Sequence, residues 1–130
     1  MHGALHGKVA IVTGSGRGIG QAVAIKFARA GARVVVNDLD DEPAAATVAA
    51  IHAVGGEARA FNGNVSAPTF GQEIVSAAVE WFGGLDIIVN NAGFTWDNVI
   101  QKMSDEQWQA LLDVHLTAPF RILRAAQPVI

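Results

Sequence analysis

The feature that most constrains this chain is a glycine-rich segment between an apolar run and a helix-like stretch. It reads Thr13-Gly14-Ser15-Gly16-Arg17-Gly18-Ile19-Gly20 and follows the apolar run Val9–Val12. Glycine lets the chain turn sharply out of a strand, brings the backbone close to a phosphate and allows a helix to pack tightly on the strand. The helix that follows directs free N–H groups at the same point. This order of elements predicts a dinucleotide-binding βαβ unit.

Apolar and helix-like segments then alternate along the whole chain, which is typical of a parallel sheet. The expected strands are Val9–Val12, Val34–Val36, Ala58–Phe61 and Ile87–Val89. Right-handed crossovers between them predict the strand order 3-2-1-4. A hydrophobic share of 51% fits a sheet that is buried on both faces. We therefore expect an α/β fold with a Rossmann-type doubly wound parallel sheet. It forms a single domain over residues 1–130 and is truncated after about four strands, because the usual fifth strand would follow Ile130.

About five helices are expected, and four can be placed: from about Gly18 to Ala30, from Asp40 or Asp41 to about Val54, from Ser66 to Gly83, and from Ser104 onward. Ser66 is the predicted N-cap of the third helix. Ser104 and Gln107 have the spacing of a capping box at the start of the last helix. Apolar positions such as Trp108 and Leu112 give this last helix an apolar face.

Composition and charge exclude several classes of protein. The net charge is −3 and there is no basic run, so a nucleic-acid partner is not expected. Cysteine is absent, and the four histidines show no metal-ligand spacing, so neither a disulfide nor a metal site is expected. The N-terminus has no apolar signal region, and no apolar stretch is long enough to span a membrane. A cytoplasmic protein without a membrane partner is therefore expected.

Polar residues follow three of the expected strands, at the sheet edge where ligands bind in such folds. Asp38 follows the second strand, 18 positions after Gly20. A carboxylate there accepts hydrogen bonds from the ribose hydroxyls of NAD and repels the 2′-phosphate of NADP, although Asp38 could also be a helix cap. Asn64-Val65 follows the third strand, and the Asn64 amide offers a donor and an acceptor to an adenine edge or forms a simple turn. Asn90-Asn91-Ala92-Gly93 follows the fourth strand.

The glycine segment and the Asn90–Gly93 segment together resemble the N-terminal, cofactor-binding half of a short-chain dehydrogenase/reductase. The Asn37-Asp38 pair and the segment Val114-His115-Leu116 are similar to those of 3-oxoacyl reductases and 3-hydroxyacyl dehydrogenases of that family. The resemblance implies an NAD(P)-dependent oxidoreductase that interconverts hydroxyl and carbonyl groups, with 3-oxoacyl compounds as a candidate substrate class. It also implies a homo-oligomer, because the last helix packs against a partner subunit in whole members.

The residues expected to bind the cofactor combine the glycine turn with the three strand ends. They are Gly14, Gly16, Arg17, Gly18, Ile19, Gly20, Asp38, Asn64, Val65, Asn91, Ala92 and Gly93. Arg17 complicates the choice of cofactor, since some NADP-using members place a basic residue before the corresponding glycine. Asp38 opposes the 2′-phosphate directly, so NAD is favoured over NADP.

The chain departs from the family pattern in its catalytic residues. The family uses a tyrosine and a lysine three residues apart, and this chain contains no tyrosine. The resemblance therefore implies that the 130-residue chain is inactive on its own. Two alternatives to an enzyme remain at this point. The chain is either a non-catalytic dinucleotide-binding fragment or a self-associating half-domain.

His115 stands where the family pattern has an asparagine of the catalytic set. One interpretation is a partly buried helix histidine without a chemical role. The other interpretation depends on Pro119, which has no N–H to donate to the carbonyl four residues earlier. That carbonyl belongs to His115, and it could hold a water of the proton relay, as the family's asparagine position does through its backbone.

Overall fold

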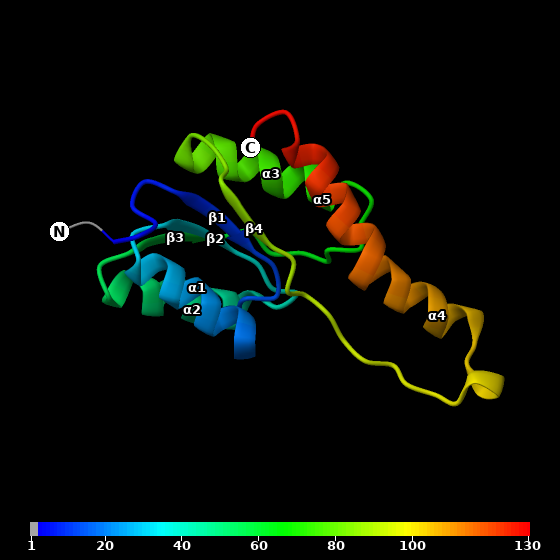
Figure 1. The fold of residues 1–130 in the computed structure, drawn as a ribbon. Helices are drawn as coiled ribbons and strands as arrows, with labels where there is room; N and C mark the ends of the chain where they lie inside the picture. Colours follow the sequence, from blue (N-terminus) through cyan, green and yellow to red (C-terminus); the bar gives the residue numbers. More distant parts are fainter. Residues whose placement is uncertain (1–2) are drawn as a thin grey trace.

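A computed structural model describes residues 3–130. A four-stranded parallel sheet lies at its centre, in the order β3-β2-β1-β4 (Figure 1). The strands are β1 (Val9–Val12), β2 (Arg33–Val36), β3 (Glu57–Ala60) and β4 (Ile87–Val89). β1 lies between β2 and β4, with Ile11 opposite Val35 on one side and Ile88 on the other. The predicted Rossmann-type fold and its strand order are confirmed.

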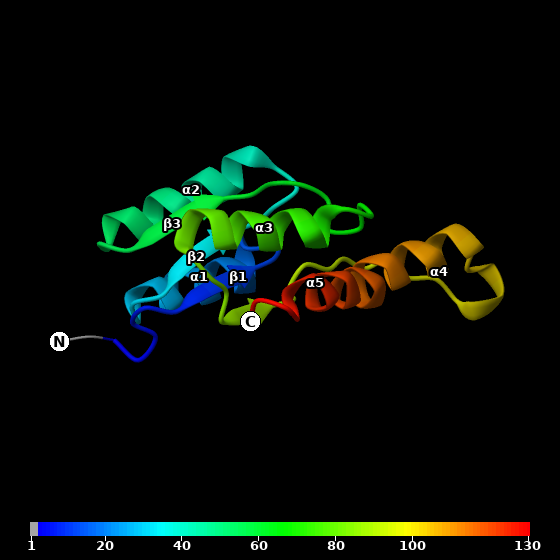
Figure 2. The same cartoon turned by 90° about the horizontal axis from the view of Figure 1, so that it is seen from above.

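Helices cover both faces of the sheet. They are α1 (Gly18–Arg29), α2 (Asp41–Ala53), α3 (Phe70–Phe82), α4 (Asp105–Leu112) and α5 (Ala118–Ala126), with a 3-10 turn η1 (Ile100–Lys102) and a π-helical turn η2 (Asp113–Thr117). α1 and α2 lie on one face, and α3 and α5 lie on the other (Figure 1). Both views show the segment after β4 and α4 projecting beyond the sheet (Figure 2). No helix among residues 3–130 combines the length and the apolar character needed to cross a bilayer.

Two apolar clusters hold these layers together, one on each face of the sheet. Ile11 and Val35 belong to the cluster that includes Ile74 of α3 and Ile122 of α5. Val12, Val34 and Val36 alternate with them along the strands and belong to the cluster formed with α1 and α2. Successive strand residues point to opposite faces, so burial on both faces requires the continuous apolar runs seen in the sequence.

The start of the third helix differs from the prediction. α3 begins at Phe70, and Ser66 does not cap it. The Ser66 Oγ is buried without a hydrogen-bond partner, while its backbone N–H donates to Asn64 Oδ1 at 2.9 Å. Asn64 therefore closes a turn of its own before the helix, and the N-cap lies three residues further along the chain, at Thr69. The predicted helix end at Gly83 is confirmed, with a left-handed φ of +84°.

The last helical segment is also not one continuous α-helix. Its predicted capping box is present, because the Gln107 N–H donates to Ser104 Oγ at 3.1 Å and the Gln107 side chain accepts from the Ser104 N–H. At η2 the hydrogen-bond register changes, and the N–H of Ala118 donates to the carbonyl of Asp113, five residues back. Pro119 follows directly and has no N–H to continue an α-helical ladder.

The predicted apolar face of this last segment is largely exposed. The side that packs on the core carries Ala118, Ile122 and Ala126. Trp108 is 58% exposed and Phe120 is 56% exposed, on the side away from the core. The sequence pattern therefore contained two apolar faces, of which only one packs within this chain.

Candidate functional site

The glycine turn between β1 and α1 needs its glycines for different reasons. Gly14 has φ +61°, and a Cβ there would lie 2.9 Å from the Cα of Ala92. A Cβ on Gly20 would collide with the carbonyl oxygen of Gly14. Gly18 has open space around it but adopts φ +60°, which side chains disfavour. The turn is therefore held in one conformation that only glycine tolerates at these positions.

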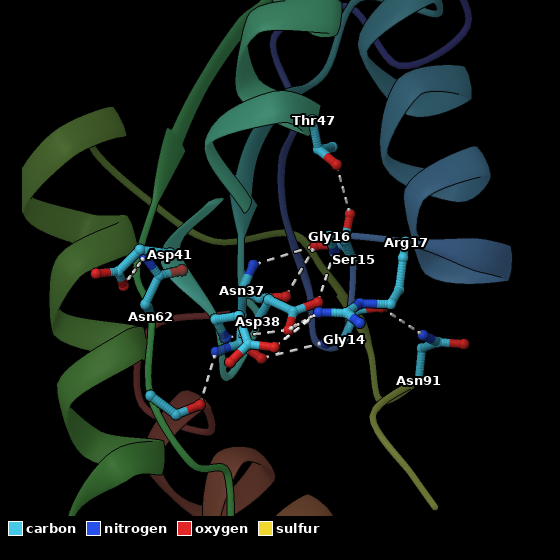
Figure 3. Close-up of polar contacts among 12 residues, drawn as sticks. Gly14, Ser15, Gly16, Arg17, Asn37, Asp38, Asp41, Thr47, Asn62 and Asn91 are labelled. Carbon is cyan, nitrogen blue, oxygen red and sulfur yellow. Dashed lines mark hydrogen bonds and ion pairs between the residues drawn. The ribbon is translucent and has the colours of Figure 1, made fainter. Parts of the chain in front are cut away.

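Asn37, directly after β2, fastens this turn to the sheet. Its Oδ1 accepts from the Gly14 N–H at 3.2 Å, and its backbone carbonyl accepts from the Ser15 N–H at 2.7 Å. The Ser15 Oγ accepts from the Asn37 N–H at 3.1 Å (Figure 3). Asn37 is 1% exposed. The sequence reasoning did not assign Asn37 a site role, although a polar residue directly after a buried strand was a usable signal.

Asp38 lies beside the same turn and is 8% exposed. Its Oδ2 accepts from the Gly16 N–H at 3.2 Å, and its Oδ1 accepts from the Asp40 N–H at 3.2 Å. A Cβ on Gly16 would collide with the Asp38 carboxylate, so the two residues fit together tightly. An Nη2 atom of Arg17 lies 3.7 Å from Asp38 Oδ1 and 2.8 Å from Asp40 Oδ2 (Figure 3).

The segment after β4 is fastened to the other side of the turn by Asn91. The Asn91 Nδ2 donates to the carbonyl oxygens of Thr13 and Gly14, at 3.2 Å and 3.1 Å. The backbone N–H groups of Asn91 and Ala92 both donate to Thr13 Oγ1 at 3.0 Å. Asn91 therefore ties the segment after β4 to the end of β1.

His115 lies in η2 and its side chain is exposed. Its Nε2 is 3.0 Å from the carbonyl oxygen of Phe94. Since the Ala118 N–H donates to Asp113 and Pro119 has none, the carbonyls of Val114 and His115 both lack a donor four residues ahead. Two successive backbone carbonyls in η2 therefore lack the N–H donor that an α-helix would supply.

A cavity of about 660 Å³ lies at this edge of the sheet. Eight of the predicted cofactor residues line it: Gly14, Arg17, Asp38, Asn64, Val65, Asn91, Ala92 and Gly93. The residues that line it without having been predicted include Asn37, Leu39, Asp40, Phe94, Asp113 and Val114. Gly16 and Gly20 are buried beneath the turn, whereas Gly18 and Ile19 are exposed at the start of α1. Leu39, 69% exposed, directly follows Asp38 and could have been found from that position.

The start of α1 gives this site its capacity for anions. No side chain caps the helix, and its first turn contains no acidic residue. Unpaired N–H groups at a helix start attract phosphate through hydrogen bonding and the helix dipole. Residues 3–130 contain no cluster of three side chains suited to holding a metal ion. The site therefore combines a glycine turn and helix start suited to a phosphate with a buried carboxylate that retains acceptor capacity.

A family model described as short chain dehydrogenase matches residues 8–130, and the chain belongs to this family. It is 45% identical to the hydroxyacyl-CoA dehydrogenase ChsB1 of Mycobacterium tuberculosis, over 94% of this chain and 40% of that protein. It is 42% identical to a 3-oxoacyl-[acyl-carrier-protein] reductase of Synechocystis, over 94% of this chain and 50% of that protein.

Solved structures of the family share the fold. A short chain dehydrogenase from Mycobacterium avium superimposes with a TM-score of 0.94 at 43% identity, covering 97% of this chain and 47% of that one. A metagenomic short-chain oxidoreductase in complex with NADP gives a TM-score of 0.90 at 39% identity, covering 95% and 57%. The chain spans about half the length of these relatives.

Proposed function

We propose that this chain binds a nicotinamide dinucleotide in the 660 Å³ cavity, with the pyrophosphate at the start of α1 and the adenosine ribose at Asp38. The observation that carries the proposal is the Asp38 carboxylate, which lines the cavity beside an uncapped helix start. A carboxylate has about four lone-pair sites. Two accept from Gly16 and Asp40, which leaves acceptor capacity for ribose hydroxyls.

The preferred cofactor on this proposal is NAD. Asp38 is an acceptor for hydroxyl groups and repels a 2′-phosphate at the same place. Arg17, the cation nearest to Asp38, already pairs with Asp40 at 2.8 Å, and releasing it toward a phosphate would break that pair. One relative is in complex with NADP, so support for a preference for NAD has to come from these residues of this chain.

The reaction that we propose is the interconversion of hydroxyl and carbonyl groups. The dinucleotide supplies or accepts the hydride when bound. The names of the relatives above favour acyl compounds, so 3-oxoacyl or 3-hydroxyacyl substrates are the proposed class. The 130 residues contain no tyrosine, whereas the resemblance to the family implies proton chemistry by a tyrosine and a lysine. The role that we propose for His115 in a proton relay belongs to its backbone carbonyl and not to its imidazole.

The alternative is that the chain acts only as a dinucleotide-binding fragment or as a self-associating half-domain. The exposed apolar side chains of Trp108, Leu116, Phe120 and Leu123 favour association. We propose a homo-oligomer formed through this face and a cytoplasmic location. Neither of these two proposals depends on catalysis by the chain.

Calorimetric titration of the purified chain with NAD and with NADP tests the cofactor proposal. We expect both to bind at one site, with the smaller dissociation constant for NAD. If NADP binds more tightly, Arg17 and not Asp38 determines the cofactor preference. If neither cofactor binds, the dinucleotide proposal is wrong for this chain.

A further inference from the structure

The segment after β4 reaches the cavity at Gly93 and Phe94. Residues 90–99 form neither helix nor strand, so individual contacts must hold this segment. Asn91 and Ala92 are tied to Thr13, as described above. The next contact along the chain is between Phe94 and the His115 ring. His115 therefore holds the Phe94 end of the part that lines the cavity, and Asn91 holds the other end.

Gly93 shows how closely the imidazole fits this segment. A Cβ added to Gly93 would lie 2.5 Å from Cε1 and 3.2 Å from Nδ1 of His115. Gly93 is not one of the glycines with a positive φ, so its backbone conformation is open to alanine. A Cβ at this position would therefore have to displace the imidazole, whereas the backbone conformation itself accepts alanine.

The hydrogen bond to Phe94 fixes which nitrogen of His115 is used. The Phe94 carbonyl can only accept, so Nε2, at 3.0 Å, carries the hydrogen in this arrangement. In the other tautomer Nε2 accepts from the Phe94 N–H, at the longer distance of 3.4 Å, so Phe94 is its partner in both. Nε2 is therefore engaged with the backbone, which favours a role in placing the segment over a role in proton transfer.

The strand order places this contact on one half of the proposed ligand. β1 lies between β2 and β4, so Asp38 and Gly93 flank the Gly14 turn from opposite sides. With the adenosine ribose at Asp38 and the pyrophosphate at the turn, the nicotinamide half faces Gly93 and Phe94. This placement rests on the proposed function.

We propose that His115 is a positioning residue, which locks Gly93 and Phe94 against η2 and so sets the affinity for the nicotinamide half of the dinucleotide. The small size of Gly93 and the position of the His115 imidazole fit each other in this chain. Enlarging Gly93 is harmful only while the imidazole is present, and removing the imidazole loosens the segment without touching the adenosine half.

The first test needs no ligand. Amide hydrogen exchange of Phe94 and thermal unfolding are measured for His115→Ala, Gly93→Ala and the double variant. We expect faster exchange in His115→Ala, a lower melting temperature in Gly93→Ala, and little further loss from Gly93→Ala when His115 is already alanine. Gly84→Ala is the matched control, because a Cβ there meets nothing within 4 Å. Equal losses from Gly93→Ala in both backgrounds would overturn the proposed contact.

The second test compares NAD with ADP as probes. Loss of one hydrogen bond and its ordering effect is expected to weaken NAD binding by His115→Ala about three- to tenfold, with ADP binding unchanged. His115→Asn, which keeps a donor, should recover part of the loss. His52→Ala is the control, since that ring also approaches a backbone carbonyl, of Ala58, at 3.3 Å.

Equal weakening of NAD and ADP by His115→Ala, or no weakening of either, would refute the positioning role. If the unmutated chain binds neither probe, the proposed function fails, while the exchange experiment still decides whether His115 holds the segment.

Discussion

Asp38→Ala is expected to weaken NAD binding by about 30- to 150-fold and to narrow or reverse the preference over NADP. Hydrogen bonds to a charged group contribute about 1.5–3 kcal/mol each, and two ribose hydroxyls face the carboxylate in the proposed pose. Water replaces part of this interaction, so a loss of about 2–3 kcal/mol is expected, which gives the stated factor. The 2′-phosphate of NADP loses no favourable contact when the carboxylate is removed. Arg17 is at the same time released from its 3.7 Å contact with Asp38.

The same substitution also affects the fold of the turn. It removes the acceptor for the N–H of Gly16, which is buried, and an unpaired buried donor costs about 1–3 kcal/mol. Urea unfolding of each variant therefore has to accompany the titrations. Asp38→Asn removes the charge while keeping one oxygen for Gly16, and should lose less stability. Asp97→Ala, an exposed carboxylate outside the cavity lining, is the control. A folded Asp38→Ala chain with unchanged NAD affinity would refute the assignment.

Two further predictions concern activity and assembly. The isolated 130-residue chain should show negligible turnover with NADH and 3-oxoacyl thioesters or simple ketones, because it has no tyrosine to act as general acid. General acid–base catalysis typically contributes ~10²–10⁴-fold to the rate. Turnover like that of an ordinary whole enzyme would contradict this prediction. Light scattering at micromolar concentration should show association that weakens on dilution. Trp108→Glu should reduce this association, because it removes a half-exposed apolar side chain. A constant monomer mass across the dilution series would argue against association.

The sheet and most of the cofactor site could be predicted from the sequence because their signals are local. A parallel strand buried on both faces has to be apolar throughout, as Val9–Val12 is. Gly14 and Gly20 are required by close contacts at one strand-to-helix turn, and turns of this kind have a recognisable spacing. Asp38 could be located because it lies two residues after the end of a predicted strand.

The remaining features depend on competition between contacts, which a sequence pattern does not rank. Ser66 and Asn64 both suit the turn before α3, and the asparagine takes the backbone N–H. Pro119 indicated a lost helical bond, but not that the register would shift at Asp113–Thr117. The exposure of Trp108 depends on which face of the last segment packs on α3 and the sheet. The contact between Gly93 and His115 joins residues 22 positions apart and has no signal in the sequence.

The cavity at the carboxyl edge of the sheet is the proposed site of the dinucleotide. Mapping backbone amide shifts of the chain during titration with NAD tests it most directly. The largest changes are expected at the exposed start of α1, Gly18 and Ile19, and at the cavity residues Gly14, Asp38 and Gly93. Changes confined to the groove between α3 and α5, around Gln72 and Arg124, or no saturable change at all, would contradict the claim.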